Sequence, residues 1–315
     1  MSSLDNLTLR LRRITWETEG VISLDLSALD GSDLPGFAPG AHIDLQMQDG
    51  QIRQYSLCGD PADRSTYRIG VKAVASGNVS RAIHRDLRVG TLLTVSAPRN
   101  NFELRPAPNY LFIAGGIGIT PILPMLRAAT QAGAKWTLLF CVRHHEEAPF
   151  LAEAQAMGGE VVLHSSALGT RLDVAARLAD APADTQLYCC GPQALMEDVE
   201  THSRHWPQGH VHFEWFAARS RPEDEVSGGF EIFCAQTGVT LVVPPDNSVT
   251  QILAEAGINL STSCEQGICG TCECRVLEGV VDHRDSILST AEQESNAIMM
   301  ACVSRAKTPR LVLDL

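Results

Sequence analysis

Four cysteines near the C-terminus set the strongest constraint on this chain, because few folds can hold thiols at their spacing. Cys264, Cys269 and Cys272 are followed much later by Cys302. This Cys-x4-Cys-x2-Cys…Cys pattern is the ligand spacing of a [2Fe-2S] cluster. Glycines lie between these cysteines, as expected of a loop that wraps closely around inorganic sulfide. The pattern predicts a cluster-binding loop and one-electron chemistry.

The residues alone leave two alternatives open for these cysteines. A structural zinc site would favour paired Cys-x2-Cys knuckles, and small cysteines also fill hydrophobic cores. The complete spacing favours the cluster over both. A further thiol, Cys274, lies two residues beyond Cys272 and leaves open which sulfur is the ligand, although the x4-x2 spacing favours Cys272.

Length and composition describe an ordinary globular protein with more than one domain. The chain has 315 residues, which favours two or three domains. Its 44% hydrophobic and 20% charged content gives no indication of disorder. The sequence has neither a signal peptide pattern nor an 18-residue apolar run, so we expect a cytoplasmic protein without membrane attachment. Ten cysteines in that compartment indicate metal ligands and buried thiols rather than disulfides.

The net charge of −12 argues against nucleic acid as a partner, because that affinity comes mainly from Lys and Arg. The acidic excess is uneven: the stretch from Phe230 to Leu315 contains 11 acidic and 5 basic residues. An acidic domain of this kind suits docking to a basic partner, and a solvated acidic surface fits the charge equally well.

Residue patterning divides the chain into three segments, placed at 1–106, 107–218 and 229–315. The first segment alternates apolar and polar residues between frequent Pro-Gly and Asp-Gly turns, which predicts a small antiparallel barrel. Its strands are expected at 7–12, 21–26 and 43–47.

The second segment alternates short apolar runs with helical patterns, which predicts a mostly parallel sheet. Strands are expected at 110–114, 136–142, 160–164 and 186–190. Helices are expected at 121–131, 148–157, 171–179 and 192–203.

A polar stretch punctuated by Pro and Gly, 217–229, is the best linker in the chain. The segment that follows contains the cluster cysteines. Its pattern predicts a hairpin of 230–233 with 239–243, a helix over 249–256, and strands at 275–277 and 310–313.

A strand of the first segment carries groups that can hold a flavin nucleotide. Arg53, Tyr55 and Ser56 supply a guanidinium for phosphate, an aromatic face for the isoalloxazine and a hydrogen-bond donor near its N5. The motif alone is weak evidence, because Tyr and Ser alternate on many surface strands. Gly77 leads through Ser80 into an expected helix, whose exposed N–H groups favour phosphate.

A glycine-rich turn, 114–121, joins a buried strand of the second segment to a helix and can admit a pyrophosphate. Thr120 is expected to cap the helix, with Pro121 at its first position. Pro121 stands where the dinucleotide fingerprint Gly-x-Gly-x-x-Gly has its third glycine, so a standard Rossmann dehydrogenase is not the closest match. A glycine turn needed only for close packing is the alternative.

A second turn from strand to helix contains Cys190, Gly191 and Pro192. It places Cys190 at the carboxyl edge of the sheet, where ligands bind. Cys189 is expected to face the opposite side, in the core.

Together these motifs resemble the phthalate dioxygenase reductase family over essentially the full length. The resemblance is carried by the cluster cysteines and by Arg53-x-Tyr-Ser-Leu57, Gly77-x-x-Ser80, Pro98-Arg-Asn-Asn-Phe102, Gly115-Gly-x-Gly-x-Thr-Pro121, Cys190-Gly-Pro192 and Glu214-x-Phe216. It implies a multidomain α+β fold: an antiparallel β-barrel flavin domain, an α/β nicotinamide-binding domain with a parallel sheet, and a C-terminal β-grasp plant-type ferredoxin domain. Related reductases of the benzoate dioxygenase and methane monooxygenase types carry the ferredoxin first and use FAD. The order here, with the segment 98–102, favours FMN.

The resemblance implies residue roles at the flavin. Arg53 would contact the phosphate side of FMN, Tyr55 would pack on the flavin, and Ser56 would hydrogen-bond near N5. Gly77 and Ser80 would assist at the phosphate.

It also implies roles at the nicotinamide. Gly116, Gly118 and Thr120 would border the nucleotide, and Cys190, followed by Gly191, would lie near the nicotinamide C4. Phe216 would close the flavin edge. Ser56 and Cys190 are therefore the predicted catalytic residues.

The implied activity is that of an NADH-dependent reductase serving a terminal oxygenase, of Rieske type, or an O-demethylase. Nicotinamide delivers two electrons and the cluster accepts one, so the flavin must divide them. NADH is favoured by the family and, weakly, by Glu146 and Glu147 after a strand, which suit ribose hydroxyls. One alternative is a reductase of the same architecture serving an independent ferredoxin or another iron protein. A redox-sensing module is disfavoured, because a sensor needs no pair of nucleotide sites.

Overall fold

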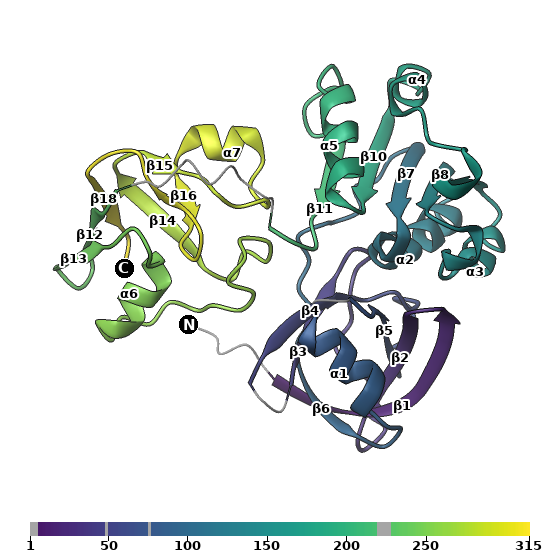
Figure 1. Ribbon diagram of the computed structural model, residues 1–315, viewed down its shortest axis with the longest axis horizontal. Helices are drawn as coiled ribbons and strands as arrows, with labels where there is room; N and C mark the ends of the chain where they lie inside the picture. The colour runs from purple at the N-terminus through teal and green to yellow at the C-terminus, as the bar shows by residue number, and fades with distance from the viewer. Residues whose placement is uncertain (1–5, 48–49, 75–76, 219–227) are drawn as a thin grey trace. The chain divides into compact units, whose positions relative to one another are not determined.

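The structure is a computed structural model that divides into two compact units, Met1–Glu214 and Trp215–Leu315. Figure 1 follows the chain through both units. The described residues are 6–47, 50–74, 77–218 and 228–315.

The first sheet is six-stranded and antiparallel, in the order β4-β3-β6-β1-β2-β5. Its strands are β1 (Asn6–Thr18), β2 (Val21–Ala28), β3 (His42–Gln46), β4 (Ile52–Ser56), β5 (Tyr67–Lys72) and β6 (Leu92–Ser96). A bridge between Leu57 and Ile69 joins the chain after β4 to the opposite edge strand, so the sheet closes into a barrel. The predicted barrel is confirmed.

Alternation along the strands explains the barrel core. Leu9 and Leu11 of β1 and Leu24 and Leu26 of β2 point inward, and each is at most 2% exposed. Helix α1 (Asn78–Asp86) adds its buried side chains to the same cluster.

The second sheet is wholly parallel, in the order β11-β10-β7-β8-β9. Its strands are β7 (Asn109–Gly115), β8 (Lys135–Val142), β9 (Glu160–Ser165), β10 (Thr185–Cys190) and β11 (Val211–Glu214). The helices are α2 (Ile119–Gln131), α3 (Leu151–Gln155), α4 (Val174–Ala179) and α5 (Gln193–His202), with 3-10 turns η1 (Gly116–Gly118), η2 (His145–Glu147) and η3 (Ser166–Leu168). The four predicted strands are present, and β11 is an additional strand that the residue pattern missed.

The strand order reverses between β7 and β10. The chain runs outward from β7 through β8 to β9, then returns to place β10 and β11 on the other side of β7. Ligands of parallel sheets bind at such a switch point, outside the carboxyl ends of the strands. Both glycine-containing turns, after β7 and after β10, lie there.

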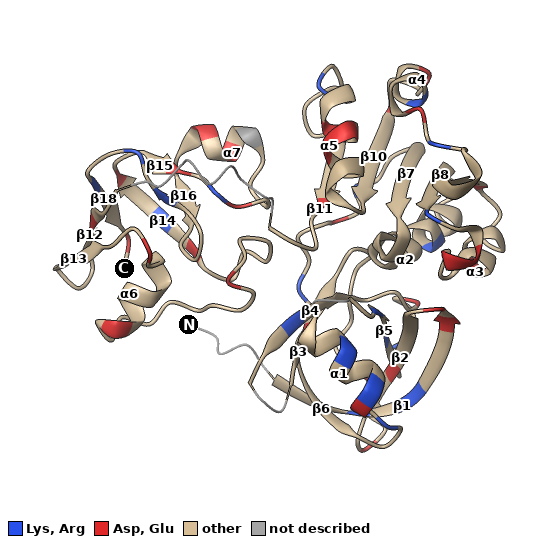
Figure 2. Cartoon of the chain, in the orientation of Figure 1, with Lys and Arg blue, Asp and Glu red and all other residues tan. Residues whose placement is uncertain are grey.

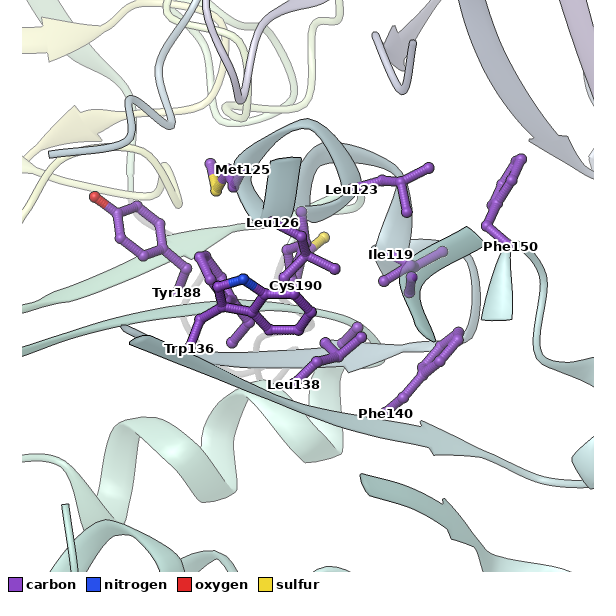
Figure 3. Close-up of a cluster of buried hydrophobic side chains, with 14 of the residues drawn as sticks. Ile119, Leu123, Met125, Leu126, Trp136, Leu138, Phe140, Phe150, Tyr188 and Cys190 are labelled. Atoms are coloured by element: carbon purple, nitrogen blue, oxygen red, sulfur yellow. The ribbon is translucent and has the colours of Figure 1, made fainter. Parts of the chain in front are cut away.

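Helix α2 is anchored by an apolar core. Figure 3 shows its side chains, among them Leu123 and Leu126, in one buried cluster with Trp136 and Leu138 of β8. Each buried large apolar side chain contributes roughly 1.5–3 kcal/mol. This packing fixes the start of α2, and with it the glycine turn.

The start of α2 differs from the expectation for Thr120. The helix begins at Ile119 after Gly118, without a side-chain cap, and Thr120 lies inside its first turn. The Thr120 hydroxyl donates to the Ile117 carbonyl at 2.9 Å. The 3-10 turn η1 that runs directly into α2 takes the place of a capping residue, so the predicted cap is wrong.

The second unit contains a mixed five-stranded sheet in the order β13-β12-β18-β14-β16, in which β12 and β18 are parallel. Its strands are β12 (Phe230–Cys234), β13 (Val239–Val243), β14 (Glu273–Glu278), β16 (Ile298–Met300) and β18 (Arg310–Leu313), with a smaller pair, β15 (Val281–Asp282) and β17 (Arg305–Ala306). Helix α6 (Val249–Glu255) packs on the sheet, and α7 (Thr290–Ser295) lies between β15 and β16 in the chain. The predicted hairpin, helix and strands are confirmed. In the described parts of the chain, we find no helix with the length and apolarity needed to span a bilayer.

Candidate functional site

The four cysteines of the sequence pattern come together as two pairs. Cys264 is hydrogen-bonded to Cys269, and Cys272 is hydrogen-bonded to Cys302. The bond from Cys264 lowers the pKa of Cys269 to about 5 and raises the pKa of Cys264. Thiolates are the form in which cysteine ligates a metal.

Backbone N–H groups of the loop point at these sulfurs. The N–H groups of Gln266 and Ile268 donate to Cys264, the first over 3.3 Å, and the N–H of Gly267 donates to Cys302. Glu265, with φ of 53°, and Gly267, with φ of 69°, turn the backbone so that it can do this. Such donors stabilise thiolates and set the potential of a cluster.

The arrangement of the thiols fits a two-iron cluster. A [2Fe-2S] cluster takes two protein ligands on each iron, whereas structural zinc takes four at one centre. Across the described residues, no group of three or more His, Cys, Asp or Glu side chains could hold one metal ion. Two pairs of thiols match the first arrangement and not the second.

Cys272 and Cys274 have different surroundings. Cys272 packs with Met300 and Cys302, whereas Cys274 lies in the main sheet core and pairs with Met299 across β14 and β16. Burial raises the pKa of Cys274 to about 12, so its thiol stays protonated. Cys274 thus has the environment of a core residue.

Strand β4 presents the predicted flavin residues on two faces. Arg53 and Tyr55 lie on one face, as residues two apart on a strand do. Arg53 is exposed, and its guanidinium donates to the Ile52 carbonyl at 2.8 Å. Tyr55 is half-buried against the barrel core, and Ser56, on the other face, is buried.

Glu214 is the residue that sequence reasoning missed. The Ser56 hydroxyl donates to Glu214 Oε2 over 3.3 Å, across 158 positions of sequence. Burial raises the pKa of Glu214 to about 8, so the carboxyl group is protonated at neutral pH. Its register partner on β10 is Cys190. The only sequence signal was its place in the Glu214-x-Phe216 motif.

Cys190 is fully buried at the end of β10. Burial, and after it the charge of Glu214, raises the pKa of Cys190 well above its ordinary value. A Cβ on Gly118 would lie 2.2 Å from the Cys190 carbonyl oxygen, and one on Gly191 would lie 3.0 Å from Gly115 Cα. The two turns therefore touch through glycine backbone, so close packing alone already requires these glycines. Cys189, also buried, contacts Met196 with its sulfur at 3.5 Å.

The remaining predicted residues are more scattered. Ser80 donates to the Gly77 carbonyl and accepts from the Val74 N–H, so its hydroxyl stabilises the turn into α1. Gly116, with φ of 54°, has Lys72 Nζ 4.0 Å from the position of a Cβ, which puts a cation at the glycine turn. Phe216 is 41% exposed and belongs to the second unit, so its place at a flavin edge stays a prediction.

Arg99 is a second residue without a predicted role. Its Nη2 donates to Asp44 at 2.6 Å, and among the described residues its buried Nε and Nη1 have no hydrogen-bond partner. Buried donors left unpaired are rare. A ligand with acceptor oxygens, such as a flavin nucleotide, would satisfy them.

Family comparisons cover each part of the chain. Residues 12–104 match the oxidoreductase FAD-binding domain, residues 112–201 the oxidoreductase NAD-binding domain, and residues 232–307 the 2Fe-2S iron-sulfur cluster binding domain. The chain is therefore an oxidoreductase with a flavin-binding, an NAD-binding and a 2Fe-2S domain.

Curated relatives match along nearly the whole chain. The tert-butanol monooxygenase / tert-amyl alcohol desaturase reductase subunit of Aquincola tertiaricarbonis is 42% identical over 98% of this chain and 96% of its own. The phthalate 4,5-dioxygenase oxygenase reductase subunit of Pseudomonas putida is 40% identical over 94% of this chain and 93% of its own.

Solved structures agree. An intact type IV self-sufficient cytochrome P450 monooxygenase matches with a TM-score of 0.90 and 36% identity over 98% of this chain, which spans only 41% of that longer protein. Phthalate dioxygenase reductase, described as a modular structure for electron transfer from pyridine nucleotides to [2Fe-2S], matches with a TM-score of 0.72 and 33% identity over 99% of this chain and 98% of its own. From these matches in sequence and in structure, we conclude that the chain belongs to the phthalate dioxygenase reductase family.

Proposed function

We propose that this protein is the reductase component of a multicomponent oxygenase or O-demethylase, passing electrons from NADH through FMN and a [2Fe-2S] cluster. The observation that carries the proposal is the meeting of Ser56, Glu214 and Cys190. Ser56 ends a strand of the flavin barrel, and Cys190 ends a strand of the NAD-binding sheet. Glu214 connects them, because it accepts a hydrogen bond from Ser56 and pairs with Cys190 across strands β11 and β10.

The residues at this place would position the two nucleotides. When bound, nicotinamide supplies a hydride and flavin accepts it, which requires close approach rather than an acid or base. Gly116, whose Cβ position has Lys72 Nζ at 4.0 Å, would border the nucleotide, and Gly118 and Gly191 let the two turns pack in contact beneath it. Cys190 would add a small, buried, uncharged side chain. Ser56, held by protonated Glu214, would orient the flavin.

The phosphate side of the flavin would be held by positive charge. Exposed Arg53, which donates to the Ile52 carbonyl and to Gln51, can exchange these neutral acceptors for a charge-assisted bond to phosphate. The buried Nε and Nη1 of Arg99 have no hydrogen-bond partner in the described part of the chain, and the turn from Gly77 to Ser80 starts helix α1. Tyr55, next to Ser56, would pack on the ring.

Electrons would leave from the edge of the cluster loop that carries Cys264. Cys264 is partly exposed, whereas Cys269, Cys272 and Cys302 are between 2% and 8% exposed. A groove of about 460 Å³ lies beside this edge, lined in part by Thr262 and Glu265. A redox partner seated there would be close to the metal.

The domain limits that accompany this proposal are 1–106, 107–218 and 229–315. The barrel strands end with β6 at Ser96 and the parallel sheet begins with β7 at Asn109. The third domain would begin just before β12. The proposed linker, 217–229, falls for the most part outside the described residues.

FMN is the proposed flavin because the segment 98–102 resembles the FMN branch of these reductases more than the FAD branch, and FAD is the alternative. This segment is braced by Asn100, whose side chain donates to the Pro39 carbonyl and accepts from the Phe102 N–H, both at 2.9 Å. Flavin released from the protein by acid and separated by chromatography distinguishes FMN from FAD.

NADH is the proposed donor. Glu146 and Glu147 are exposed in η2, directly after β8, where carboxylates can accept from ribose hydroxyls and repel a 2′-phosphate. The cytoplasm is the proposed compartment, because none of the ten cysteines is paired in a disulfide and a reducing environment would keep them so.

The proposed acceptor is a terminal oxygenase of Rieske type, and the acidic third domain would favour a basic docking face on it. Helices α6 and α7 of that domain carry glutamates, drawn in red in Figure 2. The alternative acceptor is an independent ferredoxin or another iron protein. The electron path from NADH to the cluster would be the same for either acceptor.

Anaerobic stopped-flow reduction by NADH tests the proposal. Flavin bleaching should precede cluster bleaching, and NADPH should react more slowly. Truncation after Ala217 should keep NADH oxidation with ferricyanide and lose reduction of the oxygenase. If the cluster stays oxidised in the full chain, the proposed route is wrong.

A further inference from the structure

The segment between β15 and α7 packs directly behind the cluster loop. The Ser286 N–H donates to the Gly267 carbonyl at 2.9 Å, and the Gly267 N–H donates to Cys302. A Cβ on Gly267 would lie 2.6 Å from Val303 Cγ2 and 3.1 Å from Asp285 Cα, so this approach requires glycine. Two hydrogen bonds thus connect the segment to a proposed ligand.

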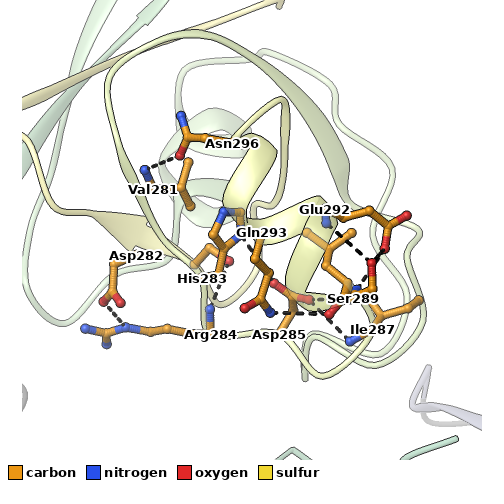
Figure 4. A network of polar contacts seen from close by, with 12 residues as sticks. Val281, Asp282, His283, Arg284, Asp285, Ile287, Ser289, Glu292, Gln293 and Asn296 are labelled. Carbon is orange, nitrogen blue, oxygen red and sulfur yellow. Dashed lines mark hydrogen bonds and ion pairs between the residues drawn. The ribbon is translucent and has the colours of Figure 1, made fainter. Parts of the chain in front are cut away.

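The carboxyl group of Asp285 holds this segment in its turn. Its Oδ2 accepts from the N–H groups of Ile287 at 3.2 Å and Leu288 at 2.8 Å. Figure 4 shows Asp285 beside Ile287 in this turn. The Asp285 side chain is completely buried, and its Oδ1 lies 3.7 Å from Nδ1 of His283. Within the described part of the chain, Oδ1 accepts no hydrogen bond. Burying a carboxyl group this way is unfavourable, so a neutral core residue would serve packing better.

The same turn supplies the apolar cover of one thiol pair. Ile287 and Leu288 pack against Cys272 and Cys302 in a small hydrophobic cluster. The bonds to Asp285 fix the backbone of both covering residues. Apolar cover and N–H donors to sulfur are two of the factors that set the reduction potential of an iron-sulfur cluster.

We propose that Asp285 is a positioning residue of the cluster: it fixes the turn behind the loop, and its charge lowers the reduction potential. Reduction adds an electron to the cluster, and a nearby buried carboxylate opposes that added negative charge. The inference rests on the proposed function, because it assumes that the four cysteines hold the cluster.

The test uses the full chain with its cofactors. Asp285→Asn keeps an acceptor oxygen for both N–H groups and removes the charge. Glu278→Gln is the matched control, since it removes one charge from an exposed position on β14, where solvent screens it. Asp285→Ala removes both the charge and the acceptor. Iron content, the EPR spectrum and the midpoint potential from a redox titration are measured in each.

Asp285→Asn should retain iron and favour cluster reduction by ~3- to 10-fold in equilibrium constant, where a tenfold change is about 59 mV for one electron. Glu278→Gln should match the parent. Asp285→Ala should lose iron or show a broadened EPR spectrum. Loss of iron in Asp285→Asn, with Glu278→Gln intact, would contradict the expectation that an acceptor oxygen at this position is enough to hold the turn.

A potential in Asp285→Asn no higher than that of Glu278→Gln, with unchanged iron in Asp285→Ala, would overturn the inference. Failure of the proposed function is distinguishable, because the parent protein itself would then lack the reduced cluster signal.

Discussion

The cluster loop and the place where Ser56 meets Glu214 are built in opposite ways. Three of the four cluster cysteines lie within residues 264–272, and the sulfur of Cys264 accepts N–H bonds from Gln266 and Ile268 of the same short loop. Ser56 and Glu214 are 158 positions apart and meet only because a barrel and a parallel sheet pack together. A local site is encoded by spacing, whereas a distributed site is encoded by the whole fold.

This difference predicts how each site responds to substitution. Removing one cysteine ligand should disrupt the whole cluster site, because the cluster needs every thiolate. A substitution at the distributed site should weaken only the contribution of that residue to nucleotide binding or stability, because each residue is held by a different strand or helix.

The largest effect is expected for Cys272→Ser. A hydroxyl cannot replace a ligand thiolate without weakening or losing the site, so the EPR signal of the reduced [2Fe-2S] cluster should disappear or change strongly. Cys274→Ser is the matched control in the sheet core and should preserve the signal at modest packing cost. NADH should still reduce the flavin in both. A normal cluster in the first and a lost one in the second would reverse the ligand assignment.

Arg53→Ala should weaken the distributed site at one point. Loss of a charge-assisted phosphate contact is worth about 1.5–3 kcal/mol, or roughly 10- to 150-fold in flavin affinity. Fluorescence titration of the flavin-free protein measures this. Arg12→Ala, at an exposed position of β1, is the control and should bind as the parent does. Equal flavin affinities for the parent, Arg53→Ala and Arg12→Ala would show that Arg53 does not contact the flavin phosphate.

Gly118→Ala tests whether the two turns must touch. Gly118 has φ of −62°, which suits alanine, so only the 2.2 Å approach to the Cys190 carbonyl opposes the change. Such overpacking costs about 1–3 kcal/mol and should raise the KM for NADH with ferricyanide as acceptor. Gly36→Ala, which meets nothing within 4 Å, is the control. An unchanged KM in Gly118→Ala would separate this turn from the nucleotide site.

The effect expected for Glu214→Gln depends on pH. The pKa of Glu214 is raised to about 8 in the folded protein, against roughly 4.3 when unfolded. Its contribution to stability is therefore complete below the lower value and is lost as pH rises through 8. The parent should lose thermal stability between pH 5 and 8.5 relative to Glu214→Gln, with flavin release on heating as the measurement. Parallel pH profiles for the two proteins would contradict the raised pKa.

The sequence pattern predicted most elements because their signals are local. Alternating apolar residues marked the barrel strands, and short apolar runs marked β7, β8, β9 and β10. Strand β11 was missed, since its four residues include His212 and Glu214 and lack a continuous apolar run. Its strand character comes from pairing with β10.

Sequence alone determined the cluster spacing, the glycine turns and the family, because each depends on short motifs of neighbouring residues. Only the tertiary structure decided that the cysteines pair two by two, that Thr120 bonds to Ile117 rather than capping α2, and that Glu214 meets Ser56. The physical reason is that hydrogen-bond partners and burial are set by the path of the folded backbone. That path decides between near partners, as for Thr120 and Ile117, and brings together distant ones, as for Ser56 and Glu214.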